Sequence, residues 1–420
     1  MKALVIGGGG REHALCWKLK KSPSVAHVWC APGNDGIARD VECLPARTGD
    51  ITAILALAQK IRPDIIVVGP EEPLVLGLSD ELSRNGFRVI GPSRAAAQLE
   101  GSKVFAKQFM DRNAIPTARI YGIYDDPAKA ETALESIPLP VVIKADGPCA
   151  GKGVLVTGSL LEAQHFVRRL MSQKEFGAAG GTVLLEEALE GVELSFIVLS
   201  DGQNFMPMVP ARDHKRVFDG DRGPNTGGMG AYSADGMLST DLEAGILEKV
   251  VRPTLAGIAR EGSPFVGFLY SGLMLTPKGP KVLEYNCRMG DPECQAIVAR
   301  MDFDFGEALQ AAAEGHLKGF SARWSPAASV CVVLTSGGYP GAYQTGKRIS
   351  GLREAEKSGD AVVFHSGTKA ADGNFVTAGG RVLGVTAAAG DLPSAAARAY
   401  AAAGRIRFDD MHYRKDIASK

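Results

Sequence analysis

Short apolar runs alternate with stretches of helical period along the first hundred residues. The runs, each of which predicts a strand, lie at residues 4–6, 28–30, 65–68 and 89–90. Between the second and third runs, apolar residues recur along one stripe from Ile51 to Ile61, and Asp50 precedes them as a plausible helix N-cap. This alternation predicts β-α-β units and a parallel sheet. Glycine- and proline-rich loops follow all four runs, and such loops meet at the sheet edge where ligands bind.

Beyond residue 100 the pattern mixes strands and helices. Ser102 is expected to cap a helix that Pro116 ends. Residues 117–190 predict a small α+β unit with strands at 141–144, 154–157 and 183–186, a helix at 160–171 and a loop at 172–181. Residues 191–323 combine strands at 194–199, 272–275 and 281–285 with helices at 243–261 and 292–300. The last block predicts strands at 329–335, 361–365 and 380–386 and an alanine-rich helix at 394–404.

Composition narrows the class of protein. At about 150 residues per domain, 420 residues predict two or three domains. Basic and acidic side chains number 47 each, so the chain lacks the net positive field of a general nucleic-acid binder. The seven cysteines show no C-x-x-C spacing, and the apolar runs are far shorter than the ~20 residues that cross a bilayer. We expect a soluble cytoplasmic protein that engages neither nucleic acid nor a membrane.

The first candidate site is the glycine run at 7–10, which follows a strand and opens a helix. Free backbone N–H groups and the helix dipole favour a phosphate there. The dinucleotide fingerprint G-x-G-x-x-G is not met, because its third glycine would fall on Glu12 or His13. The alternative is a tight β-α turn that binds no ligand.

The second candidate is the glycine-rich segment 144–154, which lies between two predicted strands. It does not satisfy the Walker A pattern, because the spacing of Gly147 and Gly151 is one residue too short. Such a loop can instead fold over nucleotide phosphates, with Lys144 supplying positive charge. The alternative is a flexible hairpin with solvated lysines.

Two further candidates are acidic strand ends. Glu186 and Glu187 end an apolar strand before a linker, whose backbone can bind an adenine while Glu193 reaches a ribose, although paired glutamates are usually just solvated. At 281–288 a period of two places Glu284, Asn286 and Arg288 on one face and Leu283, Tyr285 and Cys287 on the other. A carboxylate beside an amide oxygen suits Mg²⁺, and Arg288 suits a small carboxylate. The alternative is a polar sheet face balanced by one salt bridge.

The fifth candidate is segment 210–232, which has neither helical nor strand period. We expect a long loop, and a loop of this length with many glycines is costly to order without a function. The alternative is a solvated surface excursion, and His214 alone is more often structural than catalytic.

Taken together, these residues resemble the glycinamide ribonucleotide synthetases, a family of ATP-grasp enzymes in purine biosynthesis. The resemblance covers the whole chain. Its motifs are GGGGREHA at 7–14, GPEEPL at 69–74, LEGSK at 99–103, IKADG at 143–147, AGKGV at 150–154, DHKRVFDGDRGPNTGGMGAYS at 213–233, EYN at 284–286, GDPE at 290–293, FHSGT at 364–368, GGRVL at 379–383 and YRKDI at 413–417. The departures are Pro148-Cys149, Cys287, Met289 and Asp235, which leave the charged positions intact.

The resemblance implies an α/β and α+β multidomain ATP-grasp fold. A Rossmann-like preATP-grasp domain would occupy 1–100, an ATP-grasp domain 101–323 with a mobile lid at about 117–190, and a β-rich domain 324–420. The family reaction joins glycine to 5-phosphoribosylamine through a glycyl phosphate, with ATP and Mg²⁺ or Mn²⁺. A monomer or weak homo-oligomer is expected.

The resemblance also implies roles for single residues. Glu284 and Asn286 would hold the metal, Arg288 the glycine carboxylate and Asp213 its ammonium group. The ATP-binding residues would be Lys103, Lys144, Gly151, Lys152, Gly153, Glu186, Glu187, Leu189 and Glu193. Further substrate contacts would come from Gly8, Gly9, Gly10, Asn34, Glu71, Gly290 and Asp291. The alternatives are another ATP-grasp ligase, a nucleotide-binding regulator without turnover, and an NAD-dependent oxidoreductase, against which the missing third glycine counts.

Overall fold

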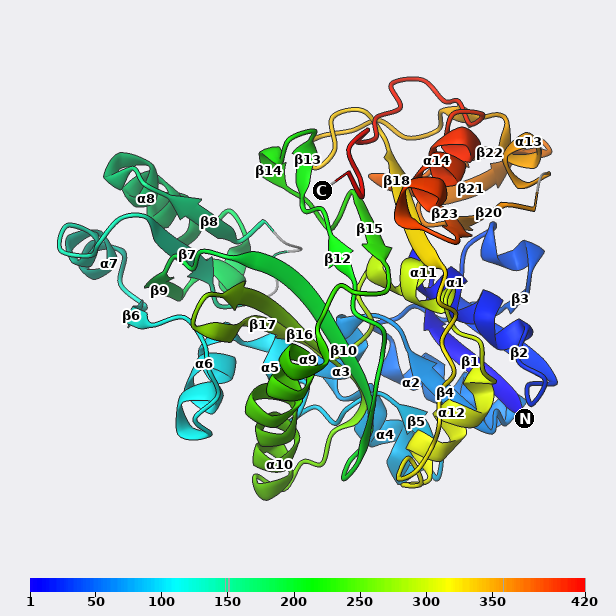
Figure 1. Cartoon of the computed structure of the whole chain (residues 1–420), viewed down its shortest axis with the longest axis horizontal. Helices are drawn as coiled ribbons and strands as arrows, with labels where there is room; N and C mark the ends of the chain where they lie inside the picture. Colours follow the sequence, from blue (N-terminus) through cyan, green and yellow to red (C-terminus); the bar gives the residue numbers. More distant parts are fainter. Residues whose placement is uncertain (148, 150–151, 358, 420) are drawn as a thin grey trace.

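The computed structural model describes residues 1–147, 149, 152–357 and 359–419, so Gly151 lies outside the described residues. The first hundred residues form a parallel sheet in the order β3-β2-β1-β4-β5, as predicted (Figure 1). Its strands are β1 (Lys2–Gly7), β2 (His27–Pro32), β3 (Glu42–Cys43), β4 (Ile65–Val68) and β5 (Val89–Ile90). Its helices are α1 (Gly10–Lys20), α2 (Ile51–Ile61), α3 (Glu71–Leu76) and α4 (Leu78–Arg84), with a 3-10 turn at Ile37–Arg39. Asp50 caps α2 by accepting from the N–H of Ala53.

Residues 120–187 form a separate antiparallel sheet in the order β6-β9-β7-β8, which extends to one side of the molecule in Figure 1. The elements are β6 (Ile120–Tyr124), α7 (Pro127–Leu134), β7 (Val141–Ala145), β8 (Val154–Thr157), α8 (Leu160–Val167), a π turn (Arg168–Ser172), a 3-10 turn (Gly177–Gly180) and β9 (Val183–Glu187). We call this unit the lid sheet. The sequence pattern did not predict β6, because most of its residues are half-buried and show no clear alternation.

A long antiparallel sheet in the order β11-β10-β16-β17 lies at the centre. Its strands are β10 (Val192–Asp201), β11 (Phe205–Pro207), β16 (Val266–Thr276) and β17 (Gly279–Asn286), and the neighbouring helices are α5 (Gln98–Gly101) and α6 (Lys103–Arg112). The helix expected at 243–261 is divided into α9 (Thr240–Ile246), a π turn (Leu247–Val251) and α10 (Arg252–Arg260). Pro253 explains the division, because proline cannot donate a backbone hydrogen bond to the preceding turn.

The C-terminal sheet has the order β12-β15-β18-β23-β20. It combines β12 (Arg212–Asp213) and β15 (Gly230–Ser233) with β18 (Ala328–Thr335), β20 (Ala361–His365) and β23 (Arg381–Ala389). Helices α11 (Glu293–Val298), α13 (Leu352–Glu356) and α14 (Leu392–Ala403) and a small sheet of β19 (Arg348–Ile349), β21 (Thr368–Ala371) and β22 (Asn374–Thr377) complete this part. Helix α12 (Phe305–Ala313) packs instead against β5, β10 and β16.

The expectation that 210–232 is a loop was wrong. Besides β12 and β15, the segment contains a hairpin of β13 (Arg216–Phe218) and β14 (Arg222–Asn225). These strands have two to four residues, too few to display a readable period of two. β15 is ordered by pairing with β18, which lies far downstream in the sequence.

Two apolar cores join the parallel sheet to the central sheet. Leu4 and Phe196 belong to one core, and Val5 and Phe268 belong to the other. Because adjacent residues of β1 face different cores, both faces of the parallel sheet are covered. Among the described residues, no helix is long and apolar enough to cross a membrane.

Candidate active site

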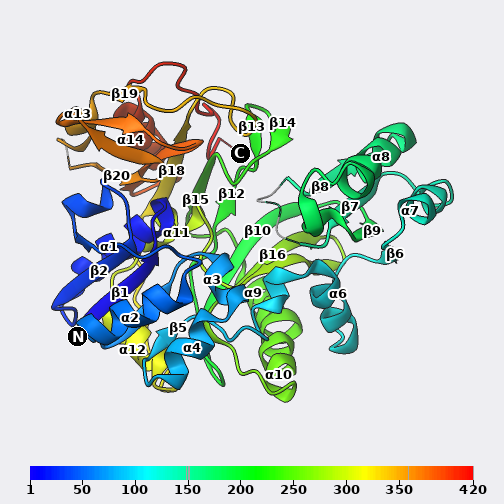
Figure 2. The ribbon, with the colours of Figure 1, turned by 180° about the vertical axis from the view of Figure 1, so that it is seen from behind.

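A cavity of about 980 Å³ lies among the carboxyl edge of the parallel sheet, the lid sheet, the central sheet and the β13–β14 hairpin. Figure 2 shows these units from behind. The predicted site residues that line the cavity are Glu71, Lys103, Lys144, Lys152, Gly153, Glu186, Glu187, Leu189, Glu193, Asp213, Glu284, Asn286, Arg288, Gly290 and Asp291. Gly8, Gly9, Gly10 and Asn34 do not line it.

Strand β17 and the residues after it supply one wall. Glu284, Asn286 and Arg288 all line the cavity, while Cys287 is buried behind them, as period two predicts. Leu283 and Tyr285, which were predicted to face away, also line the cavity. For Leu283 the reason is a β-bulge: Gly272 pairs with Glu284 but Leu273 pairs with Val282, which leaves Leu283 as an extra residue.

Arg288 is held by two carboxylates from different elements. Its Nε lies 3.2 Å from Glu71 Oε2, and its Nη2 lies 2.6 Å from Glu100 Oε1. Burial opposes ionisation of Glu71, but Arg288 and Arg11 outweigh it and lower the pKa of Glu71 to about 2. Glu100 was not among the sequence candidates, although it lies inside the LEGSK motif.

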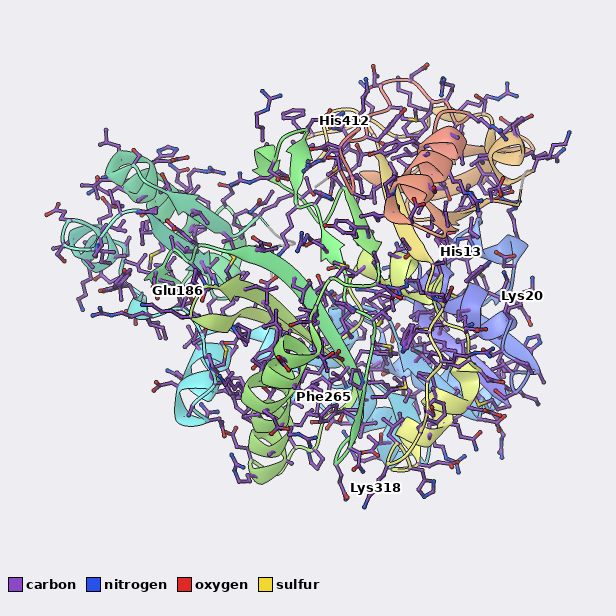
Figure 3. All side chains as sticks on the ribbon, in the orientation of Figure 1. His13, Lys20, Glu186, Phe265, Lys318 and His412 are labelled. Carbon is purple, nitrogen blue, oxygen red and sulfur yellow. The ribbon has the colours of Figure 1, made fainter. Side chains whose placement is uncertain are left out.

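Two lysines converge on Glu186 at the junction of the lid sheet and the central sheet, where Figure 3 labels this glutamate. Lys144 Nζ lies 2.9 Å from Glu186 Oε2 and donates to the carbonyl of Leu283, while Lys107 Nζ lies 3.2 Å from the same oxygen. The other oxygen, Glu186 Oε1, is buried and has no hydrogen-bond partner in the described structure. Burial lowers the pKa of Lys107 to about 8 despite the attraction of Glu186. The sequence reasoning missed Lys107, although it lies one helical turn after Lys103.

The other residues around the lid differ in their partners. Lys103 Nζ donates to the carbonyl of Gly147 at 3.3 Å, and Lys152 Nζ donates to the carbonyl of Pro340 at 2.6 Å. Glu187 accepts from the N–H of Arg119 and from Lys281. The Lys152 contact joins the lid unit to the C-terminal part, and the Lys281 contact joins it to β17 of the central sheet.

Asp213 and Lys215 carry opposite charges on the side of the cavity facing β17. Lys215 Nζ lies 3.4 Å from Glu193 Oε2 and 4.0 Å from Glu284 Oε1. Burial raises the pKa of Asp213 to about 7, and nearby carboxylates, led by Glu293, add to the increase although Lys215 opposes it. Asp213 therefore changes its charge near neutral pH.

Glu293 is a buried carboxylate that the sequence analysis did not assign, and it interacts electrostatically with both Asp213 and Arg288. Glu293 Oε1 accepts from Tyr270 at 2.8 Å and from Ser195 at 3.0 Å. Glu293 is the last residue of the GDPE motif, but its hydroxyl partners lie on β10 and β16, and the sequence gives no signal that these strands pack beside it.

The glycine run at the start of α1 lies close to the C-terminal part. The N–H of Gly9 donates to Glu12 Oε2 at 2.7 Å, and Asn34 Nδ2 donates to the carbonyl of Gly8 at 2.8 Å and to that of Ser366. A side chain at Gly10 would collide with Ser366 Oγ. The run therefore forms a tight β-α turn whose first donor is satisfied by its own helix.

Three models of one protein family match consecutive parts of the chain. They are described as the N domain (residues 1–100), the ATP-grasp (A) domain (101–294) and the C domain (329–420) of phosphoribosylglycinamide synthetase. This chain is a phosphoribosylglycinamide synthetase family member. The fold is accordingly a multidomain ATP-grasp fold.

Relatives within this family match along the full length. Proteins named phosphoribosylamine–glycine ligase from Vibrio vulnificus strain YJ016 and Escherichia coli O6:H1 are 46% and 48% identical, with 99% of this chain and 97% and 98% of theirs covered. A crystal structure of the Thermotoga maritima ligase matches with a TM-score of 0.86 and 35% identity, covering 99% of this chain and 100% of that one. A Campylobacter jejuni biotin carboxylase structure, at 16% identity and a TM-score of 0.72, covers 99% and 94% and shares the fold.

Proposed function

We propose that the cavity joins glycine to 5-phosphoribosylamine, with conversion of ATP to ADP and phosphate, in de novo purine biosynthesis. The relatives that carry the ligase name match 99% of the chain. The observation that carries the proposal is that Glu284, Asn286 and Arg288 line the same cavity as Lys144 and Glu186 of the lid sheet. A reacting carboxylate and a nucleotide can therefore meet there.

We assign the nucleotide to the space between the lid sheet and the central sheet. Lys103, Lys144, Lys152 and Gly153 would face the phosphates, and Glu186 to Leu189 with Glu193 would hold adenosine. The charge of Lys144 is already oriented by Glu186 and by the carbonyl of Leu283, so little reorganisation is needed when a phosphate arrives. In this proposal the chain has three domains, at residues 1–100, 101–323 and 324–420, and residues 117–190 or so form the lid.

Glu284 and Asn286 suit Mg²⁺ or Mn²⁺ held jointly with the phosphates. Within the described residues the amide of Asn286 has no hydrogen-bond partner, and Glu284 has only the long contact with Lys215. Their oxygens are hard ligands, and few protein ligands are typical of Mg²⁺. A bound metal ion supplies charge neutralisation of the phosphates. No group of three or more acidic, histidine or cysteine ligands occurs among the described residues.

Arg288 and Asp213 would hold the two ends of glycine. A fork-shaped guanidinium can bind a carboxylate through two hydrogen bonds, but in this structure Glu71 and Glu100 occupy Nε and Nη2. The more exposed Glu71 would therefore give way when glycine binds, and Glu100 would remain. Gly290 and Asp291 lie on the same wall. The phosphoribosylamine would lie at the sheet edge, where it would face Glu71, which lines the cavity, and Gly8, Gly9, Gly10 and Asn34, which lie outside its lining.

The chemistry then needs positioning and exclusion of water. The glycine carboxylate attacks the γ-phosphorus of ATP, which releases ADP and leaves glycyl phosphate. The amine attacks the carbonyl carbon, and phosphate leaves as the C–N bond forms. Since water attacks an acyl phosphate readily, closure of the lid sheet over the cavity protects the intermediate.

Release of ADP, measured with each substrate omitted in turn, tests the proposal. We expect rapid ADP formation only when ATP, glycine and phosphoribosylamine are all present. Binding of ATP without phosphate release for any pair of substrates would instead indicate a nucleotide-binding regulator. Turnover with a different carboxylate or amine would indicate another ATP-grasp ligase.

A further inference from the structure

The last residues of the chain lie against the β13–β14 hairpin. In Figure 1 the C-terminus is marked beside these two strands, and Figure 3 labels His412 in the same region. His412 Nε2 lies 2.8 Å from the carbonyl oxygen of Val217, within β13. The motif YRKDI at 413–417 belongs to this segment, and none of its residues lines the cavity described above.

Arg414 makes the central contacts. Its side chain is fully buried, and its Nη1 donates to Asp221 Oδ1 at 2.8 Å and to the carbonyl of Arg216 at 3.1 Å. Its Nε and Nη2 each lie 2.7 Å from an oxygen of Asp416. The guanidinium thus joins the C-terminal segment to Arg216 at the start of β13 and to Asp221 just before the start of β14.

Two backbone contacts complete the attachment at the turn of the hairpin. Asp416 Oδ2 accepts from the N–H of Gly220 at 2.8 Å, and Asp219 Oδ1 accepts from the N–H of Lys415 at 2.8 Å. The pKa of Asp416 is held well below its usual range, because burial is outweighed by the hydrogen bonds from Arg414 and Gly220. The C-terminal segment and the hairpin are therefore joined by ion pairs and by hydrogen bonds, with a carboxylate from each of them accepting a backbone N–H of the other.

The hairpin has little structure of its own to keep it in place. Only two residue pairs are in register, Arg216 with Asn225 and Phe218 with Arg222, with an irregularity between them. An isolated two-stranded hairpin is marginally stable in water. Asp221 also adopts a left-handed φ of 54°, which a non-glycine residue rarely adopts without support. Yet Arg216, Asp221 and Asn225 line the cavity opposite the lid sheet.

We propose that residues 412–418 form a clasp that positions the β13–β14 hairpin as a wall of the active-site cavity, with Arg414 as its positioning residue. This inference rests on the proposed ligase function. When the clasp is loosened, the wall opens and water competes with the amine. Water then attacks the carbonyl carbon of glycyl phosphate, which returns glycine and phosphate while the ATP is already spent.

The test compares the wild type with Arg414→Lys and Asp219→Ala, neither of which alters a cavity-lining side chain. Arg300→Lys is the matched control, because Arg300 is equally buried but binds Ser233, Asp235 and the carbonyl of Ser325 instead of the hairpin. For each protein, the ratio of ADP released to glycinamide product is measured at saturating substrates. Hydrogen exchange of amides 216–225 and the melting temperature are measured on the same samples.

We expect Arg414→Lys and Asp219→Ala to raise the ratio of ADP to product by roughly threefold and to speed exchange in the hairpin by roughly tenfold. Arg300→Lys should change neither quantity. An unchanged hairpin exchange rate, or an equal increase in the ratio for Arg300→Lys, would overturn the clasp. If Arg414→Lys does not fold, Asp219→Ala decides the question alone. A wild type that exchanges as expected but makes no product would refute the ligase assignment and leave the clasp supported by its exchange data.

Discussion

Glu100 holds both the side chain of Arg288 and the backbone beside it. Its Oε1 lies 2.6 Å from Arg288 Nη2, and its Oε2 accepts from the N–H of Cys287 at 2.6 Å. One carboxylate on α5 therefore fixes both the direction of the guanidinium and the end of β17. Because two hydrogen bonds to a charged group act at one point, the orientation of Arg288 depends on Glu100 more than on Glu71, which is only partly buried.

Glu100→Gln should raise the KM for glycine by about tenfold, because a neutral amide replaces a charged partner of the proposed carboxylate clamp. Steady-state kinetics with varied glycine checks this. Glu261→Gln is the matched control, since Glu261 is also paired with an arginine, Arg112, but on the surface. Equal glycine KM values for the wild type and Glu100→Gln would show that Glu100 does not position the clamp.

Arg288→Lys should also raise the KM for glycine by about tenfold, since a point charge replaces a fork that can bind both carboxylate oxygens. The KM for ATP should change much less, because the nucleotide is assigned to the other side of the cavity. A glycine KM that stays at the wild-type value would move the carboxylate clamp to another residue.

Glu284→Ala should reduce turnover by about 100-fold or more, because it removes a proposed metal ligand at the phosphates. The melting temperature should remain close to that of the wild type, since the side chain is partly exposed to the cavity and its one ion pair with a described residue is the long contact with Lys215. The Mg²⁺ dependence of ADP release provides the measurement. A variant with the wild-type rate contradicts the metal assignment.

The pKa of Asp213, at about 7, predicts a pH dependence for the use of glycine. Asp213 must be ionised to accept hydrogen bonds from an ammonium group, and the ionised fraction grows as the pH rises through 7. The kcat/KM for glycine should therefore rise roughly tenfold per pH unit below 7 and level off above it. In Asp213→Asn the rise of kcat/KM for glycine near pH 7 should be absent, and kcat/KM should be low at every pH. Persistence of that rise in the variant would assign it to another group.

The elements that the sequence predicted well are those whose pattern is local. The apolar runs of β1, β2 and β4 identify strands, and the two-residue run of β5 is marked by the Gly91-Pro92 turn that follows it. Ser102 and Asp50 cap the helices that follow them with their side chains, and both residues are visible in the sequence. The alternation of Glu284, Asn286 and Arg288 likewise needs only one strand. The orientation of Leu283 was not predicted, because a bulge depends on the register with the neighbouring strand.

The parts that the sequence did not predict depend on distant partners. Glu100 and Lys107 look like ordinary helical surface residues until β17 and β9 pack beside them. The role of Glu293, at the start of α11, is recognisable only from its hydrogen bonds with Tyr270 on β16 and Ser195 on β10. The strands within 210–232 are too short to show a period, so only their pairing with β18 and with each other reveals them.

The pairing of β15 with β18 has a consequence for synthesis of the protein on the ribosome. β15 cannot pair until β18 has been synthesised, and the hairpin beside β15 cannot make its contacts with residues 412–418 until the end of the chain has been synthesised. The cavity can thus be completed only after nearly the whole chain has emerged. A prematurely terminated product would carry the residues proposed to bind ATP but lack one wall around them, so that productive catalysis is expected to require full-length translation.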